Sequence, residues 1–491
     1  MHVRLRGAAL AGISLVAGSL ASCGGGGYGG GSSGYAGPMP SVTFTAPPQA
    51  ASITFGQAVM LSWTSSNASS CTASASSSTA GAFSGRQPMS GQLSVVPTAA
   101  GAVSYTLSCS GAGGSATATT ATLTVNPSIL SVLAAQKLTT IGSTLDPIEK
   151  GGNPYGLALA PTTAGLVAAG DLIVCNFNDG ATNTQGLGTT IVGLHPLAGA
   201  TPYRIAQSAT LEGCNALAIL PDGSIAAAAY TANQDALVSP AGVVGTPFAS
   251  DHFASPWGQA FVPAAAGHAA ALYVADVGGA IDRIELDGDA QSAFVQIATG
   301  FCGSGQPGAV FAPAGLTYDA ALDTLYIVDT SSNSVVAFAN VSDIGAAGIA
   351  VSGQCGSVAA PPTPAPTFGG PSAAAARVIA HGAPLISPIS AALLADGDLI
   401  VGNGDINIAS GQTPNLAVEI SPLLPGGFVG EPLQLDSSGT PGALFGIVAT
   451  AADGRQIVYF NDDNTNTVMM VASPDPAAGG MPYGATQAPS R

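Results

Sequence analysis

Six copies of one short pattern fill the C-terminal part of the chain, and this repetition restricts the possible folds more than any other feature of the sequence. Each copy has a small residue near the head of an apolar strand, then a turn, then a second apolar strand. The six small residues are Gly156, Ala216, Gly258, Gly315, Ser390 and Gly446. The second strands reach Asn176, Ala229, Asp276, Asp329, Asn403 and Asn461, so five of the six end in Asn or Asp.

The turns between the paired strands indicate antiparallel β-structure. Three of them contain Asp-Gly, at Asp222-Gly223, Asp396-Gly397 and Asp453-Gly454, and Asp-Gly between apolar runs favours a hairpin. Consecutive small residues lie 42 to 75 positions apart by subtraction, which is enough for four strands and their loops. Radially repeated four-stranded units form β-propellers. We therefore predict an all-β fold with a six-bladed β-propeller over residues 128–475.

The ends of the repeated region should meet in one blade. The sixth copy shows only three apolar strands, at 445–450, 455–461 and 467–473, and an apolar segment at 129–141 is available to supply the fourth. The small residues should leave room for neighbouring backbones around the axis. The Asn and Asp at the strand ends should close turns by bonding their own following backbone.

The repeats resemble NHL-type propellers in two patterns. One is Pro-x-Gly-Leu, as at Pro154 to Leu157, and the other is Leu-Tyr-Val-Ala-Asp, which ends at Asp276. The resemblance covers about 350 residues, and the second copy departs from it with Ala229 at the strand end. It implies a propeller fold. Propeller lactonases hold a divalent cation with Asn, Asp and Glu around the channel, but the recurrence of Asn or Asp in five of the six copies favours a structural role.

The segment before the repeats has a different composition. Residues 38–127 hold a single charged residue, Arg86, and alternate polar and apolar residues at 41–46, 58–64, 92–97, 103–109 and 118–125. Short strands at this spacing predict a small β-sandwich, with Trp63 in its core. The stretches Leu61–Cys71 and Tyr105–Gly111 resemble bacterial Ig-like or PKD-like modules, although Trp63 precedes both cysteines, unlike the antibody pattern. We favour a spacer role for this segment over a binding role.

The N-terminus has the pattern of an export signal. Arg4 and Arg6 precede a short apolar core at 7–21, which is typical of a signal peptide. Leu20-Ala-Ser-Cys23 resembles the lipobox of bacterial lipoproteins, and this resemblance implies removal of residues 1–22 and lipidation of Cys23. Residues 23–37 are rich in Gly and predict a flexible tether. We expect a lipid-anchored protein of the bacterial outer membrane, facing the periplasm or the cell surface, with a flexible tail at 476–491.

Charge excludes one class of partner. The chain has 10 Lys and Arg against 27 Asp and Glu, for a net charge of −17. Nucleic-acid binding needs cationic side chains against phosphates, so we expect no nucleic-acid partner. The mean hydropathy is +0.41, but no apolar run of ~18 residues occurs after the N-terminus, which leaves no transmembrane helix there.

Six cysteines follow Cys23, and an exported chain favours disulfides. Six cysteines allow fifteen pairings. Proximity in the chain favours pairing in order, as Cys71–Cys109, Cys175–Cys214 and Cys302–Cys355. Metal ligation is not expected, because there is no Cys-x-x-Cys and no His beside a Cys.

The sequence offers no catalytic motif that we accept. The only Gly-x-Ser-x-Gly match, Gly30 to Gly34, lies in the tether rather than on a strand–helix turn. His252 and His381 precede innermost strands and could form a pair at one mouth of the channel, although two solvated loop histidines are the simpler interpretation. Three residues that precede the small residues are aromatic: Tyr155, Trp257 and Phe445. They could ring a channel mouth and bind a ligand, or be buried between blades.

These observations favour a non-catalytic binding or scaffolding propeller, with an envelope protein, peptide or glycan as partner and no cofactor. The alternative is a lactonase-like propeller hydrolase or lyase that uses a divalent cation in the channel. A purely structural surface protein is a third possibility.

Overall fold

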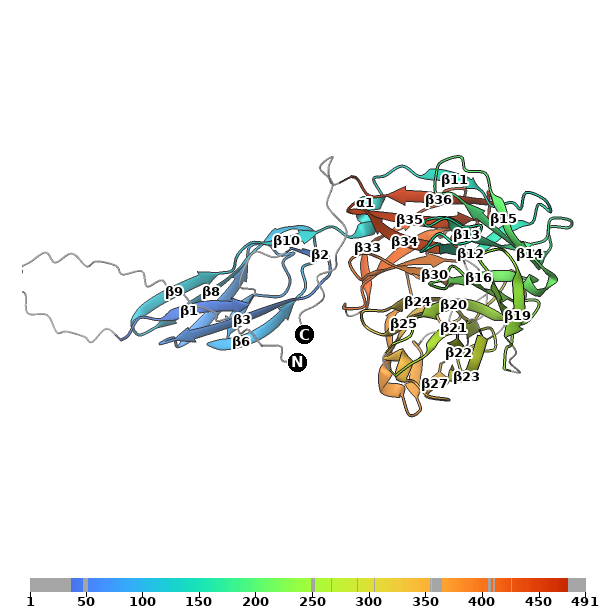
Figure 1. The fold of residues 1–491 in the computed structure, drawn as a ribbon. Helices are drawn as coiled ribbons and strands as arrows, with labels where there is room; N and C mark the ends of the chain where they lie inside the picture. Colours follow the sequence, from blue (N-terminus) through green and yellow to red (C-terminus); the bar gives the residue numbers. More distant parts are fainter. Residues whose placement is uncertain are drawn as a thin grey trace, which may run out of the picture.

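The computed structural model describes residues 37–46, 52–248, 252–265, 267–288, 290–303, 305–353, 355, 364–404, 408, 411–424 and 426–475. The fold in this part of the chain is all-β, as predicted (Figure 1). A small β-sandwich comes first in the chain and a β-propeller follows. The proposed signal peptide, Cys23, the proposed tether up to residue 36 and the tail at 476–491 lie outside the described residues.

The sandwich buries one apolar core between its sheets. Its strands are β1 (Ser41–Ala46), β2 (Ser52–Thr54), β3 (Val59–Ser66), β4 (Ser70–Ala75), β5 (Gly85–Gln87), β6 (Ser90–Val95), β7 (Gly101–Val103), β8 (Tyr105–Gly111), β9 (Gly114–Thr119) and β10 (Leu123–Asn126). They form the sheets β1-β3-β6, β5-β4-β8-β9 and β2-β10-β7. Trp63 and Tyr105 lie in the core on either side of Phe83 and meet its ring edge-on.

Six sheets make up the propeller, and each contains one strand from each of four positions. The innermost strands are β12 (Gly152–Leu159), β16 (Cys214–Ile219), β20 (Pro256–Val262), β24 (Pro313–Asp319), β30 (Pro388–Leu393) and β34 (Ile447–Ala452). The second strands are β13 (Leu172–Asn178), β17 (Ile225–Ala229), β21 (Ala270–Asp276), β25 (Thr324–Asp329), β31 (Leu399–Asn403) and β35 (Arg455–Asp462). Each innermost strand contacts the next, and β34 contacts β12, so the ring is closed.

The outer strands complete the blades. The third strands are β14 (Gln185–Leu194), β18 (Gln234–Val238), β22 (Ala280–Asp287), β26 (Ser334–Ala339), β32 (Leu416–Ile420) and β36 (Thr467–Ala472). The fourth strands are β15 (Tyr203–Gln207), β19 (Val244–Phe248), β23 (Ala290–Thr299), β29 (Ala376–His381), β33 (Phe428–Gln434) and β11 (Thr139–Ser143). Three short 3-10 helices lie between strands: η1 (Ala209–Leu211), η2 (Val341–Asp343) and η3 (Ala373–Ala375).

The last blade takes its fourth strand from the start of the repeated region. β11 pairs antiparallel with β36, in the sheet order β11-β36-β35-β34. The sequence placed this strand within 129–141, and only the end of that segment forms it. Ile129–Leu133 is instead a short helix, α1, because the Ser128 side chain accepts from Ser131 N and caps it. Both backbone N–H groups at its start, Ile129 and Leu130, donate to the Glu419 carboxylate of β32.

The third blade is larger than predicted. β27 (Ile349–Ser352) and β28 (Thr367–Gly369) come from the long connection between β26 and β29, yet they join blade three. β27 pairs in parallel with β23, the outermost strand of that blade. The Cys302–Cys355 disulfide links the segment after β23 to the segment after β27. The sheet therefore has six strands rather than four.

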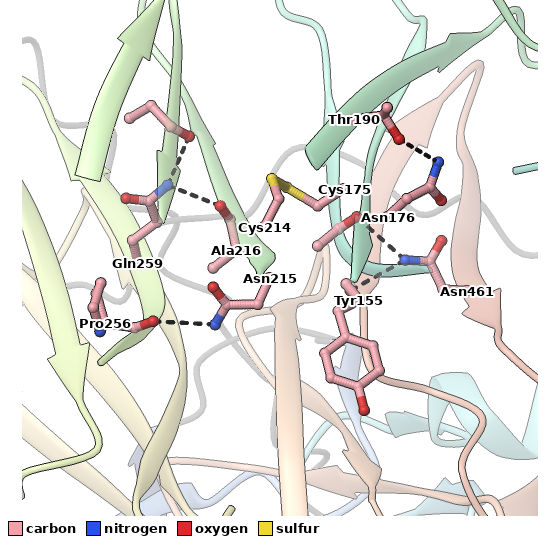
Figure 2. The surroundings of a disulfide bond; sticks show 12 residues. Tyr155, Cys175, Asn176, Thr190, Cys214, Asn215, Ala216, Pro256, Gln259 and Asn461 are labelled. Atoms are coloured by element: carbon pink, nitrogen blue, oxygen red, sulfur yellow. Dashed lines mark hydrogen bonds between the residues drawn. A yellow bond between two sulfur atoms is a disulfide. The ribbon is translucent and has the colours of Figure 1, made fainter. Parts of the chain in front are cut away.

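All three disulfides pair as predicted. Cys71 bonds Cys109 on the neighbouring strand of one sandwich sheet, and Cys302 bonds Cys355. Cys175 of β13 bonds Cys214 of β16 and so links blade one to blade two (Figure 2). Disulfides persist in oxidising compartments, so these bonds indicate an exported protein.

The small residues on the innermost strands lie against neighbouring backbones, as expected. A Cβ at Gly258 would collide with the carbonyl oxygen of Ala314 in the next blade, and a Cβ at Gly446 would lie 2.5 Å from Tyr155 O. Protein interiors are close-packed and do not open for an added methyl group. The blades can approach this closely only because these positions carry no side chain.

The Asn and Asp at the strand ends do not all act as the sequence suggested. Asp276 and Asp329 do close turns, since each accepts a hydrogen bond from a backbone N–H two residues ahead. The three asparagines bond elsewhere. Asn176 donates to Thr144 O and Asn403 to Pro384 O, both in the preceding connection. Asn461 donates to the first blade, as described below.

Candidate functional site

The propeller axis contains a cavity of about 500 Å³. All six innermost strands contribute to its wall, which is lined by residues 155–159, 161, 215–219, 257–261, 315–318, 389–393 and 445–449. A cavity of this size is in the range of ligand-binding pockets. None of the residues that the described chain contributes to this wall is Asp, Glu, His, Lys or Arg.

The cavity opens at the far ends of the innermost strands. Exposure increases along these strands, so that residues near their starts are buried while those near their ends are partly exposed. The partly exposed residues at the open end are Leu159, Ile219, Phe261, Tyr318, Leu393 and Ala449. Five of these six side chains are wholly hydrocarbon, and an incoming ligand would meet them first.

The amide side chains in the wall bond to neighbouring blades. Asn215 Nδ2 donates to the carbonyl oxygen of Pro256, and Gln259 Nε2 donates to that of Ala216 (Figure 2). The same two nitrogens also lie 2.7 Å from Trp257 O and 2.6 Å from Ala226 O. The remaining oxygens, Asn215 Oδ1 and Gln259 Oε1, are buried without a hydrogen-bond partner. Neither amide therefore offers a ligand an accessible polar atom.

The hydroxyl groups of Thr317 and Ser390 also donate hydrogen bonds to neighbouring blades. Thr317 donates to Ala391 O at 2.7 Å, and Ser390 donates to Leu444 O at 2.6 Å. Both bonds cross from one blade to the next. The surface that the cavity offers is therefore mainly apolar.

The buried end of the axis is closed by an aromatic cluster, made of Tyr155, Phe177, Tyr230, Trp257 and Phe445. Tyr155 is stacked between two of these rings, with centroids 4.3 Å from Phe177 and 4.1 Å from Phe445. Trp257 meets Tyr155, Phe177 and Tyr230 edge-on. Burial raises the pKa of the Tyr155 hydroxyl far above its usual value.

The sequence left two alternatives for these aromatic residues, an exposed channel mouth or burial between blades. Tyr155 is only 3% exposed and Trp257 only 5%, while Phe445 is half-buried. All three do line the cavity, but from its closed end. Tyr155 and Trp257 are therefore buried, because the side chains pack on one another across the axis. Contact of these rings with a ligand stays a prediction.

The two predicted histidines lie apart from the cavity wall. His252 is exposed and stacks on Phe294 of β23, with centroids 5.5 Å apart. His381 ends β29, the outermost strand of blade four, and is partly buried. The structure does not bring either histidine into the cavity wall with Tyr155 or Trp257. Binding by these histidines stays a prediction.

Sequence reasoning missed one group of acids. Asp396 and Asp398 flank the Gly397 turn between β30 and β31, and Glu419 lies on the adjacent strand β32. Their carboxylate oxygens lie within 4.8 Å of one another. Burial and mutual repulsion raise the pKa of Asp398 to about 8 and that of Glu419 well above its ordinary value. The sequence Asp396-Gly397-Asp398 was the available signal, but we interpreted it only as a hairpin turn.

No family model and no curated protein matches the chain. Among solved structures, a catalytically inactive virginiamycin B lyase from Staphylococcus aureus, in complex with quinupristin, is similar at 13% identity and a TM-score of 0.39, over 68% of this chain and 98% of that one. A gluconolactonase from Xanthomonas campestris is similar at 14% identity and a TM-score of 0.43, over 70% and 92%. A nidogen/laminin complex matches at 14% identity and a TM-score of 0.41, over 61% and 85%. Likenesses this distant carry no conclusion about activity.

No helix in the described residues is long and apolar enough to span a bilayer.

Proposed function

We propose that this chain is an exported, lipid-anchored envelope protein whose propeller binds an apolar segment of a protein or peptide in the axial cavity, without catalysis. The observation that carries the proposal is the composition of the cavity wall. Six blades converge on about 500 Å³, and the residues that line it carry no ionisable acid or base other than the two tyrosines, Tyr155 and Tyr318.

The apolar wall favours a peptide or protein segment over a glycan. A glycan needs several hydrogen-bond partners for its hydroxyl groups, whereas the amides and the hydroxyls of Thr317 and Ser390 are already bonded to neighbouring blades. An aliphatic or aromatic side chain gains about 1.5–3 kcal/mol when it is transferred from water to such a surface. The binding free energy would therefore come from burial rather than from polar recognition.

The enzyme alternative finds little support in the same wall. Divalent cations of the Ca²⁺ and Mg²⁺ type bind through carboxylates, carbonyls and water, and general acid–base catalysis uses His, Asp, Glu, Lys, Tyr or Cys. Tyr318 hydroxyl donates to Asp323 at 3.0 Å, and its pKa is raised strongly, so it is a poor general base. The wall offers no carboxylate to hold a cation.

A photo-crosslinking residue placed at Leu159, at the open end of the cavity, tests the binding proposal. The matched control is the same residue at Leu197, which is 70% exposed on another turn of blade one and does not line the cavity. We expect discrete protein or peptide adducts from position 159 only. Equal labelling at both positions, or adducts with glycan alone, would contradict the proposal.

Catalysis and anchoring need separate tests. Turnover of a lactone or ester panel that is lost on chelation and recovered with a divalent cation would favour the enzyme alternative. The anchor depends on Cys23, so Cys23→Ser should move the protein from the detergent phase to the aqueous phase. Unchanged detergent partitioning of this variant would remove the lipoprotein proposal and leave the cavity proposal standing.

A further inference from the structure

Three carboxylates gather at the edge of blade five, outside the axial cavity. Asp398 and Glu419 are each 1% exposed, and Asp396 is partly buried. Each offers an oxygen within 4.8 Å of the others. The ion pairs in the described part of the chain involve other acids, so no cationic side chain there compensates this group.

The oxygen atoms of this cluster are incompletely satisfied. Asp396 Oδ2 and Asp398 Oδ2 are buried without a hydrogen-bond partner. Each oxygen of Glu419, in contrast, accepts a hydrogen bond, from Ile129 N at 3.1 Å and from Leu130 N at 2.6 Å. Removing unpaired charges from water costs several kcal/mol per ion, so the cluster requires a compensating positive charge or a proton.

Ser421 supplies an independent indication of a ligand. Its side chain is fully buried, and its hydroxyl Oγ has no hydrogen-bond partner of good geometry. It approaches Asp398, and this contact partly opposes the rise in the pKa of that carboxyl that burial and the Asp396 charge cause. The sheet register places it there, since Leu399 pairs with Ile420 and the next residues outward are Asp398 and Ser421. Apart from this contact with each other, the Ser421 hydroxyl and Asp398 Oδ2 have no hydrogen-bond partner in a buried site.

Blade one has an acid, Asp171, at the position of Asp398, and both of its carboxylate oxygens have hydrogen-bond partners. Asp171 precedes Leu172 as Asp398 precedes Leu399, and the residue opposite it is His195. Asp171 Oδ1 bonds His195 Nδ1 at 2.6 Å, and Oδ2 accepts from the Tyr203 hydroxyl at 2.7 Å. Blade five keeps the acid and replaces the histidine with Ser421.

We propose that Asp396, Asp398, Glu419 and Ser421 form a binding site for one hard divalent cation of the Ca²⁺ type. The donors are all oxygens, which suits Ca²⁺ and Mg²⁺ and not the N and S preference of zinc sites. Ca²⁺–oxygen distances are 2.3–2.6 Å, so two ligands on opposite sides of the ion lie at most about 5 Å apart. The spread of 4.8 Å within the cluster meets this limit.

The position of the site gives the cation a structural role. Glu419 holds the start of α1, the helix between sandwich and propeller (Figure 1). Burial raises the pKa of Asp396, and a contact from the Thr54 side chain, at the end of β2 in the sandwich, partly opposes this rise. A cation bound here would neutralise the carboxylates that hold both segments, and it would strengthen the junction of the two domains.

Calcium titration of the full chain after EDTA treatment tests the proposal. We expect one Ca²⁺ per chain by calorimetry and a rise in the thermal midpoint, because a ligand that binds only the folded state stabilises it. Asp398→Asn should lower the Ca²⁺ affinity at least ~10-fold. In EDTA the same variant should be at least as stable as the unchanged chain, because it removes repulsion.

Two further variants keep the test decisive. Ser421→Ala removes one oxygen with little change in volume, and it should weaken Ca²⁺ binding several-fold even if Asp398→Asn fails to fold. Asp171→Asn is the matched control in blade one and should leave Ca²⁺ binding unchanged. An unchanged chain that ignores Ca²⁺ and gains stability only on acidification would overturn the proposal in favour of shared protons. Full Ca²⁺ affinity in Ser421→Ala together with Asp398→Asn would also overturn it.

Discussion

Asn461, on the last blade, donates its side-chain amide to the carbonyl oxygen of Tyr155 on the first blade, 306 residues away in the chain, at 3.1 Å. The same Nδ2 also reaches Gly156 O at 3.3 Å. These bonds belong to a series of covalent and hydrogen bonds at the interfaces between blades; the one from Arg283 of blade three reaches the connection that follows β26 of blade four. The others are Cys175–Cys214, Asn215 to Trp257 O, Arg283 to Ile344 O, Thr317 to Ala391 O and Ser390 to Leu444 O.

Asn461→Leu should destabilise the propeller. It keeps a similar volume but leaves two buried carbonyl oxygens without their donor, and an unsatisfied buried polar group costs ~1–3 kcal/mol. Urea unfolding of the full chain measures this loss. The control is Asn464→Ala, whose side chain bonds on the exposed surface and should cost less than ~0.5 kcal/mol. Equal losses in the two variants would contradict a special role for the Asn461 bonds.

Trp257→Ala should behave as a core truncation. The ring is buried against Tyr155, Phe177 and Tyr230, so its removal should cost ~3–5 kcal/mol. Trp63, the other tryptophan, is also buried. Emission of the native protein should accordingly be blue-shifted and shielded from acrylamide. Strong quenching that disappears in Trp257→Ala would instead place this ring in contact with solvent.

Reduction of the disulfides should loosen the contact between blades one and two. Replacing Cys175 and Cys214 together by Ala should cost ~2–4 kcal/mol. The denatured but unreduced protein should show no reactive thiol at these positions. Mass spectrometry after alkylation checks both cysteines, and an alkylated Cys175 or Cys214 in that sample would disprove the bond.

Asp235 should make stability fall as the pH rises toward neutrality. It is fully buried in β18, neither carboxylate oxygen has a hydrogen-bond partner of good geometry, and burial raises its pKa to about 7. The folded state therefore holds this proton over a range in which the unfolded state, with an Asp pKa of about 3.9, has lost it. Stability from this group is fully present below about pH 4 and is lost as the pH rises to about 7.

Asp235→Asn isolates that effect. The variant should lack this contribution, so its free energy of unfolding should fall less between pH 4 and 7 than that of the unchanged chain. Asp222→Asn changes a turn residue that is already bonded to Ser224 and should keep the original slope. Urea titrations at several pH values provide the comparison. Identical slopes in all three proteins would show that Asp235 does not titrate in this range.

The repeats were predictable because they rest on local rules. Asp222-Gly223 and the other Asp-Gly pairs form the expected turns, and the strand after each small residue follows from alternation of apolar residues. Closure by an N-terminal strand followed from counting strands in the last copy. The cysteine pairing also followed from chain order, since each pair joins segments that the propeller and sandwich place side by side.

The remaining features depend on contacts distant in the chain. Nothing near Ile129 indicates that Glu419, 290 residues later, accepts its backbone N–H. The addition of β27 to blade three instead of blade four is likewise set by tertiary pairing. Whether Tyr155, Trp257 and Phe445 lie at an exposed mouth or are buried stayed open, because the sequence places each ring separately and does not show that the rings meet on the axis. The acids at 396, 398 and 419 approach one another only once β31 and β32 pair.

The hydrogen bonds between α1 and Glu419 determine which part of the propeller first receives a pulling force from the N-terminal side. The chain passes from the sandwich into the propeller through α1, whose first two N–H groups are held by a carboxylate of blade five. β11, which closes the ring against β36, comes after this attachment in the chain. Tension applied through the sandwich therefore reaches blade five before it reaches the closing strand, and the hydrogen bonds between β11 and β36 are shielded from that pull.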